Sequence, residues 1–393
     1  MVCPVSAQPL PGGPDYAGRS LTQVLPSAAA ALGLPGWSNA LGLPTARRVA
    51  VVMVDGLGSA HLRRHAGHAP FLKSAQAQSG SQVLTAAFPT TTAASLSSLG
   101  TGLAPGGHGL VGYDVLDPER QVVINQLGGW DRTTAPRAWQ PHATVFERIA
   151  SSPVEAESVT VSLPKFRDSA LTEASLRGSR FEEGTTLHAR FQRARQELST
   201  GPVKLVYLYL NELDRAGHRH GTGSADWLHA LEEIDGALRR LVRQVPPDTL
   251  VLATGDHGMI DVPESGRIDY STQDRLLDGI EHTAGEPRFV HLHFAVGATE
   301  RVRAATRAQW ESDYGTRAWV LSRDEAVAAG WFGTVTETVR PRIGDLLIAP
   351  FEQIALFDGR RAGPNAFEMV GHHGAPTRAE REVPLLLLHA PTA

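Results

Sequence analysis

Short apolar runs alternate with amphipathic stretches along most of this chain. Continuous apolar runs bounded by turn residues are typical of strands covered on both faces. The alternation therefore predicts an α/β fold, with a mostly parallel sheet sandwiched by helices. The strand-like runs lie at residues 48–54, 81–88, 121–126, 157–163, 203–210 and 249–254, and the helical patterns at residues 20–32, 59–78, 92–102, 186–198 and 224–245.

Residues 262–340 break this alternation. A strand-like run at residues 288–296 is followed by a helical pattern at residues 300–315, which indicates a small inserted α+β subdomain. We expect the chain to return to the main sheet at residues 342–350 and to add a last strand at residues 383–391. The predicted segments are a loose N-terminal arm (1–18), a core (19–261 and 341–393) and the inserted subdomain (262–340).

Composition excludes several classes of protein. Apolar residues make up 42% and charged residues 20% of the chain, as in globular proteins, and a net charge of −4 gives no reason to expect nucleic-acid or membrane binding. Cys3 is the single cysteine, so an internal disulfide or a thiolate metal cluster is impossible. Neither a signal peptide nor a membrane-spanning run is recognisable, and we expect a cytoplasmic protein. The oligomeric state is not predicted.

Three of the predicted strands lead to an aspartate. Asp55 follows the first strand, Asp214 comes shortly after residues 203–210, and Asp256 comes just after residues 249–254. In open α/β sheets the carboxyl ends of the strands form the ligand crevice. The three carboxylates are therefore expected at one edge of the sheet.

Glycine-flanked histidines accompany these aspartates. His218 follows Asp214 by four residues, His257 is adjacent to Asp256, and His373 lies in a Gly-His-His-Gly segment. Each pair alone is weak evidence, because such residues are common in loops and helix caps. Their joint occurrence is typical of a site for two divalent cations.

A threonine-rich segment, Phe88-Pro-Thr-Thr-Thr92, precedes a helical run of small residues. A hydroxyl at a helix N-terminus is most often an N-cap, but the same position is also an anion site. A metal-bound threonine there could attack phosphorus.

These motifs together resemble the alkaline phosphatase superfamily, and most closely its nucleotide pyrophosphatase/phosphodiesterase branch. The family's Pro-Thr-x-Thr segment, with the following Thr-Gly-Leu and His-Gly, matches residues 88–110 without a gap. The order of all five motifs is preserved. The others are its Asp-Gly (Asp55-Gly56), its Asp followed by Gly-His (Asp214, Gly217-His218), its Asp-His-Gly-Met (Asp256–Met259) and its Gly-x-His-Gly (Gly371–Gly374).

The resemblance implies an alkaline phosphatase-like core and two zinc ions, with manganese or iron as other occupants. By position, Asp214, His218 and His373 would hold one ion. Asp55, Asp256 and His257 would hold the other. Thr92, which aligns with the second threonine of the family motif, would be the nucleophile that forms a covalent phospho-threonine.

The resemblance predicts a phosphodiesterase or nucleotide pyrophosphatase acting on a small phosphorylated substrate. Nucleotide-cleaving relatives commonly carry an aromatic residue directly after the nucleophile and an asparagine three positions after it; here these positions hold Ala93 and Ser95. Ser95 is a weaker candidate for a substrate contact. Other readings stay open: a phosphonoacetate-type C–P hydrolase, a phosphomonoesterase, a metal-dependent phosphomutase, or a metal-binding protein without catalysis.

Overall fold

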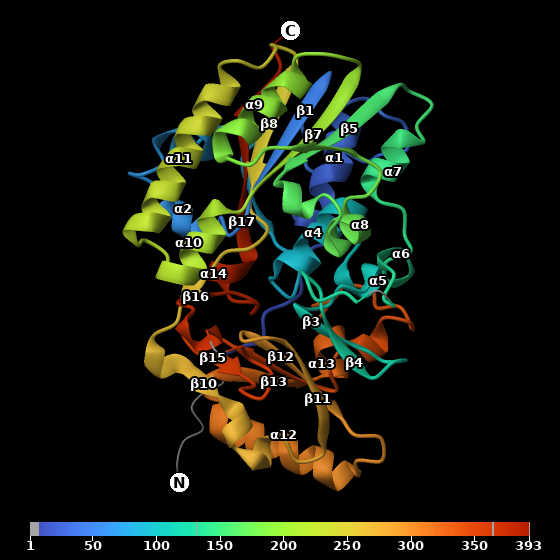
Figure 1. The fold of residues 1–393 in the computed structure, drawn as a ribbon, viewed down its shortest axis with the longest axis vertical. Helices are drawn as coiled ribbons and strands as arrows, with labels where there is room; N and C mark the ends of the chain where they lie inside the picture. Colours follow the sequence, from blue (N-terminus) through green and yellow to red (C-terminus); the bar gives the residue numbers. More distant parts are fainter. Residues whose placement is uncertain (1–7, 132, 364, 393) are drawn as a thin grey trace.

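Six of the predicted strands, together with one that was not predicted (residues 180–183), form a seven-stranded sheet in the computed structural model, which describes residues 8–131, 133–363 and 365–392. This main sheet occupies the upper half of the molecule (Figure 1). All its paired strands run parallel except β17, which is antiparallel to both neighbours, so the expected mostly parallel sheet is confirmed. The spatial order is β2 (Gln82–Thr85), β17 (Glu382–His389), β8 (Thr249–Thr254), β1 (Arg48–Val54), β7 (Val203–Leu210), β5 (Ala156–Ser162) and β6 (Arg180–Glu183).

Helices cover both faces of the main sheet. Alternate residues of β1 enter two separate cores, with Val51 in one and Val52 in the other, because successive side chains of a strand point to opposite faces. The first core is closed by α1 (Val24–Ala31), α4 (Thr92–Thr101), α7 (Val145–Ala150) and α8 (Ala170–Ser175). The second is closed by α2 (Ser59–Arg64), α3 (Pro70–Gln76), α9 (Leu187–Leu198) and α11 (Ala225–Val242).

A second, antiparallel sheet lies below the first (Figure 1). Tyr314 and Trp310 of α12 (Glu300–Tyr314) pack against it. Its six strands in spatial order are β13 (Ala318–Ser322), β14 (Leu346–Pro350), β12 (Phe289–Phe294), β11 (Ile280–Glu286), β3 (Asp114–Asp117) and β4 (Val122–Asn125). The remaining elements include two small pairs, β10 (Arg267–Asp269) with β15 (Ala355–Phe357) and β9 (Ile260–Asp261) with β16 (Gly371–His372), and the helices α5 (Pro105–His108), α6 (Pro136–Trp139), α10 (Glu212–His220), α13 (Arg323–Ala328) and α14 (Arg378–Arg381).

Three expectations need correction. The strand within residues 342–350 is β14, which pairs with β12 and β13 of the second sheet and not with the main sheet. The run at residues 121–126, expected within the main alternation, is β4 of the same second sheet. The single helix expected at residues 59–78 is two helices, because Pro70 starts α3 at its first position.

The described part of the N-terminal arm, residues 8–18, contains neither helix nor strand. It is held in place rather than loose: the Tyr16 hydroxyl donates to the Trp331 carbonyl (2.6 Å), and the Trp331 indole donates to the Pro11 carbonyl (2.8 Å). Residues 1–7, with Cys3, lie outside the described residues. The division into arm, core and insert stays a prediction. Among the described helices, none has the length and apolarity needed to cross a membrane.

Candidate metal centre

The carboxyl ends of three neighbouring parallel strands gather the predicted aspartates. β1 lies between β7 and β8. Asp55 directly follows β1, and its backbone N–H donates to the Leu210 carbonyl at the end of β7 (2.9 Å). Asp256 comes two residues after β8, and Asp214 lies in the first turn of α10, which follows β7. The strand-end argument thus gives the correct edge of the sheet.

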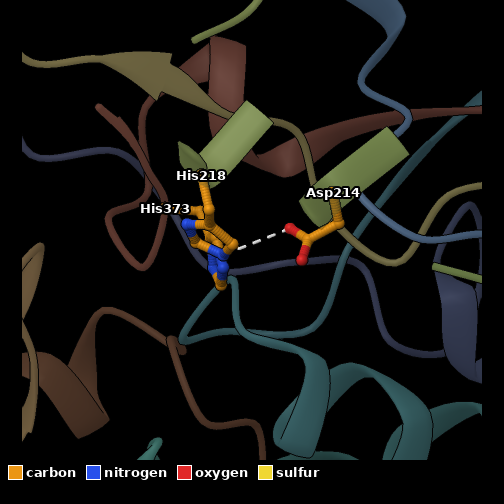
Figure 2. A group of neighbouring side chains, drawn as sticks. All are labelled: Asp214, His218 and His373. Atoms are coloured by element: carbon orange, nitrogen blue, oxygen red, sulfur yellow. Dashed lines mark ion pairs between the residues drawn. The ribbon is translucent and has the colours of Figure 1, made fainter. Parts of the chain in front are cut away.

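The first group of side chains consists of Asp214, His218 and His373 (Figure 2). Asp214 and His218 are one turn apart on α10, with 3.3 Å between the His218 Nε2 and Asp214 Oδ1 atoms. His373 arrives from the loop after β16, and its ring centroid lies 5.1 Å from that of His218. Donor atoms of the three side chains lie within 4.8 Å of one another, close enough to share an ion.

The second group surrounds His257. Its Nε2 atom lies 3.4 Å from Asp55 Oδ1 and 3.6 Å from Asp256 Oδ2. The His257 and His373 rings stack with centroids 3.6 Å apart, which joins the two groups. Position 258, next to His257, accommodates only glycine, because a Cβ on Gly258 would lie 1.9 Å from the Ala379 carbonyl oxygen. This glycine therefore permits close backbone approach rather than an unusual turn.

Each carboxylate of the centre keeps one oxygen free. The Tyr209 hydroxyl donates to Asp55 Oδ2, and the backbone N–H groups of Gly56 and His257 donate to Asp256 Oδ1 (both 3.0 Å). Asp55 Oδ1, Asp256 Oδ2 and Asp214 Oδ1 are buried and have no hydrogen-bond partner among the described residues. Orphaned buried oxygens are costly unless another group satisfies them, so the site fits a cation.

The histidines are oriented in the same sense. In each, the Nδ1 atom lies within hydrogen-bond distance of a backbone carbonyl, which leaves Nε2 as the lone-pair donor. The pairs are His218 with Gly371 (2.8 Å), His257 with Gly258 (3.0 Å) and His373 with Thr90 (2.7 Å). Aspartate oxygens with imidazole nitrogens form a donor set that suits zinc.

The electrostatics of the site also favour a cation. Burial, reinforced by the nearby charges of Asp214 and Asp256, raises the pKa of Asp55 well above its ordinary value. Burial, with His257 and His218 adding to it, lowers the pKa of His373 well below its ordinary value. A bound cation would relieve the repulsion among the carboxylates and would favour neutral imidazoles.

The structure separates the roles of the threonines in the segment 88–92. The Thr90 hydroxyl donates to the Ala375 carbonyl (3.0 Å) and accepts from the Gly374 N–H (3.0 Å), so it fastens the loop that carries His373. Thr92 is the first residue of α4, and its hydroxyl lies 3.2 Å from His257 Nε2. Thr92 therefore faces the second group of ligands.

Ser95 lies one turn further along α4 and is fully buried. Its hydroxyl donates to the Asp256 carbonyl (2.7 Å), so it supports the backbone of a candidate ligand. The substrate contact predicted for Ser95 stays a prediction. Tyr209 was not predicted, although a tyrosine near the carboxyl end of a buried strand is a signal that could have indicated it.

A cavity of about 880 Å³ opens on the centre and runs between the two sheets. Asp55, Thr92, Asp214, His218 and His373 line one end. Residues of the second sheet and its loops, including Tyr113, Asn125, Glu286 and Arg361, line the opposite side. A substrate at the metal centre would therefore meet both halves of the molecule.

This fold and centre define a member of the alkaline phosphatase superfamily. The sequence matches the family described as type I phosphodiesterase / nucleotide pyrophosphatase over residues 49–376. The chain belongs to this family and is a phosphoester hydrolase, so the resemblance drawn from the motifs is confirmed. No curated protein matches the chain.

Solved structures share the fold at low sequence identity. Human ectonucleotide pyrophosphatase / phosphodiesterase 5 is 16% identical, with a TM-score of 0.66 over 87% of this chain and 88% of that chain. The murine protein, solved as an inactive threonine-to-alanine variant with AMP, is 16% identical, with a TM-score of 0.64 over the same shares. Phosphonoacetate hydrolase from Sinorhizobium meliloti, solved with phosphonoacetate, is 18% identical, with a TM-score of 0.67 over 88% and 91%.

Proposed function

We propose that this protein is a zinc-dependent phosphodiesterase or nucleotide pyrophosphatase that acts through a covalent phospho-threonine at Thr92. One observation carries the proposal: the Thr92 hydroxyl lies 3.2 Å from His257 Nε2, which lies 3.4 Å from the unpartnered oxygen of Asp55. A hydroxyl at that position would share a cation with both side chains. The inactive threonine-to-alanine variant of the murine relative supports the same role for a threonine.

In this proposal, six side chains bind metal ions and Thr92 attacks phosphorus. Asp214, His218 and His373 would hold one ion, and Asp55, Asp256 and His257 the other. When bound, the two ions supply Lewis-acid stabilisation of phosphoryl charge and lower the pKa of the threonine hydroxyl. Thr92 Oγ1 forms its bond to phosphorus as the bond to the leaving oxygen breaks, and water then cleaves the phospho-threonine and restores the hydroxyl. The N-terminus of α4 favours the negative charge that gathers there.

The size of the cavity supports a substrate with two substantial arms. A volume of about 880 Å³ is in the range of pockets that enclose drug-sized ligands. A phosphomonoester or phosphonoacetate would fill only part of it. The fold shared with phosphonoacetate hydrolase keeps C–P hydrolysis as the second candidate.

The first experiment is a substrate panel on the zinc-loaded protein. We expect faster turnover of bis(p-nitrophenyl) phosphate than of p-nitrophenyl phosphate or phosphonoacetate, loss of activity on chelation, and its return when zinc is added. Two zinc ions per chain are expected from metal analysis. Preference for phosphonoacetate would favour C–P hydrolysis instead, and isomerisation of a sugar phosphate without phosphate release would indicate a mutase. Zinc binding without turnover of any substrate would indicate a non-catalytic metal-binding protein.

A further inference from the structure

Asn211 lies between β7 of the main sheet and α10, and its side chain does not cap the helix. It is the N-cap residue of α10, and asparagine at an N-cap normally accepts a hydrogen bond from a backbone N–H of the first turn. Here the side chain makes no capping bond. Its Oδ1 atom is buried without a partner among the described residues, and the residue is only 6% exposed. Because Oδ1 is closed off, the amide nitrogen is the polar atom of this side chain that can face the cavity.

Asn211 lies on the face of α10 that carries the metal ligands. Asn211, Asp214 and His218 follow the spacing i, i+3, i+7, which puts side chains on one side of a helix. All three line the cavity. Tyr209, two residues earlier, also lines the cavity and donates to Asp55. The amide is thus part of the wall beside the phosphoryl-transfer centre.

A neutral donor suits this position. The phosphoryl group that reacts there is an acceptor-rich anion, and a lysine ammonium would be repelled by two bound cations. An amide carries two N–H donors and no charge, and the Asn211 nitrogen, unlike Oδ1, is not buried without a partner. It can therefore add a hydrogen bond without changing the charge of the centre.

Resting on the proposed function, we propose that the side-chain amide of Asn211 donates a hydrogen bond to a non-bridging phosphoryl oxygen of the substrate. The contact serves the transferring group, so it is independent of the identity of the leaving group. It supplies the kind of contact that the resemblance sought at Ser95, whose hydroxyl is committed to the Asp256 carbonyl.

Asn211→Ala tests the contact in the zinc-loaded enzyme. We expect kcat on bis(p-nitrophenyl) phosphate to fall about 100-fold, as on removal of other preorganised donors to a reacting oxyanion. The Kd of inorganic phosphate, measured by calorimetry, should rise about 10-fold, since one such hydrogen bond to a charged group is lost. Zinc content and thermal midpoint should stay unchanged. Asn211→Asp should show the same losses, because a carboxylate has no donor and repels phosphate.

Asn125→Ala is the matched control. Asn125 also lines the cavity, but its amide donates to Asp114 Oδ1 (2.9 Å) and its oxygen accepts from the Gly128 N–H (3.0 Å). Phosphate affinity should be unchanged in this variant.

Three outcomes overturn the proposal. The first is unchanged phosphate affinity in both Asn211 variants, and the second is an equal loss in the Asn125 variant. The third is lower zinc content in Asn211→Ala with normal content in Asn211→Asp, which would make the residue a metal ligand. If the proposed function itself is wrong, the wild type would lack turnover, whereas the Kd of inorganic phosphate would still show whether Asn211 contacts phosphate.

Discussion

The two sheets of this protein contribute to one cavity in different ways. At the main sheet, the candidate aspartates follow their strands closely, as Asp55 follows β1 and Asp256 follows β8. The second sheet is assembled from separated stretches, residues 114–125, 280–294 and 318–350, and it supplies the opposite wall. Short connections thus place the candidate aspartates at one edge of the main sheet, whereas the opposite wall of the cavity depends on long-range strand pairing.

One buried contact fastens the two halves together. Arg288, between β11 and β12, makes a bidentate pair with Glu380 of α14, with bonds of 3.1 and 2.8 Å. Both side chains are fully buried. Arg288 also donates to the Ile354 carbonyl (2.7 Å). The contrast between the halves can be tested by changing one side at a time.

The largest effect is expected at the reacting hydroxyl. Thr92→Ala should lower kcat at least about 10⁴-fold, or more than about 5 kcal/mol of barrier, because no other hydroxyl occupies that position. Thr92→Ser should retain measurable turnover, since it keeps a hydroxyl at the same position. The measurement is p-nitrophenol release, with urea unfolding as a check on stability. Near-normal activity of Thr92→Ala would falsify the assignment of the nucleophile.

Breaking the link between the halves should affect stability before chemistry. Arg288→Met should cost about 3–5 kcal/mol in the free energy of unfolding, because it leaves the Glu380 carboxylate buried without its partner. The double variant with Glu380→Gln should recover part of this loss. Urea unfolding of the four proteins in this cycle measures the coupling. Equal losses in the single and double variants would contradict a pairwise link.

The second sheet should also impose a pH dependence on stability through His293. Burial lowers the pKa of His293 to about 4, with Asp345 opposing the shift and Arg323 and His282 adding to it. The unfolded chain therefore takes up a proton at higher pH than the folded one, and stability falls as the pH drops from about 6.5 towards 4. Between pH 7 and 5, the free energy of unfolding of His293→Asn should therefore fall by on the order of 2 kcal/mol less than that of the wild type. Parallel pH profiles of variant and wild type would refute this.

The smallest effect is expected at Ser95. Ser95→Ala should cost about 1 kcal/mol of stability by leaving the Asp256 carbonyl unpartnered, and KM should hardly change. Ser97→Ala is a control from the same helix, because its hydroxyl bonds Ser175 (2.7 Å) away from the centre. If KM rises in the Ser95 variant alone, the serine contacts substrate after all.

Much of the metal centre could be predicted because its residues are tied to strand ends. A parallel strand that is buried on both faces delivers the next residue to a known edge, so Asp55 and Asp256 needed no tertiary information. His373 could be included through its glycine-flanked motif. Asn211 was not among the predicted residues, because an asparagine before a helix is usually a cap, and only the structure shows that the cap is not made.

The sequence by itself determined the class of fold, the order of the motifs along the chain and the set of candidate ligand side chains. These follow from local periodicity and from residues adjacent to strands. Only the tertiary structure decided that β14 and β4 join the second sheet, since an apolar run does not encode its pairing partner. It also decided which hydroxyl is free: Thr90 and Ser95 are bonded to backbone, whereas Thr92 faces His257. Such choices depend on distances between segments far apart in the chain.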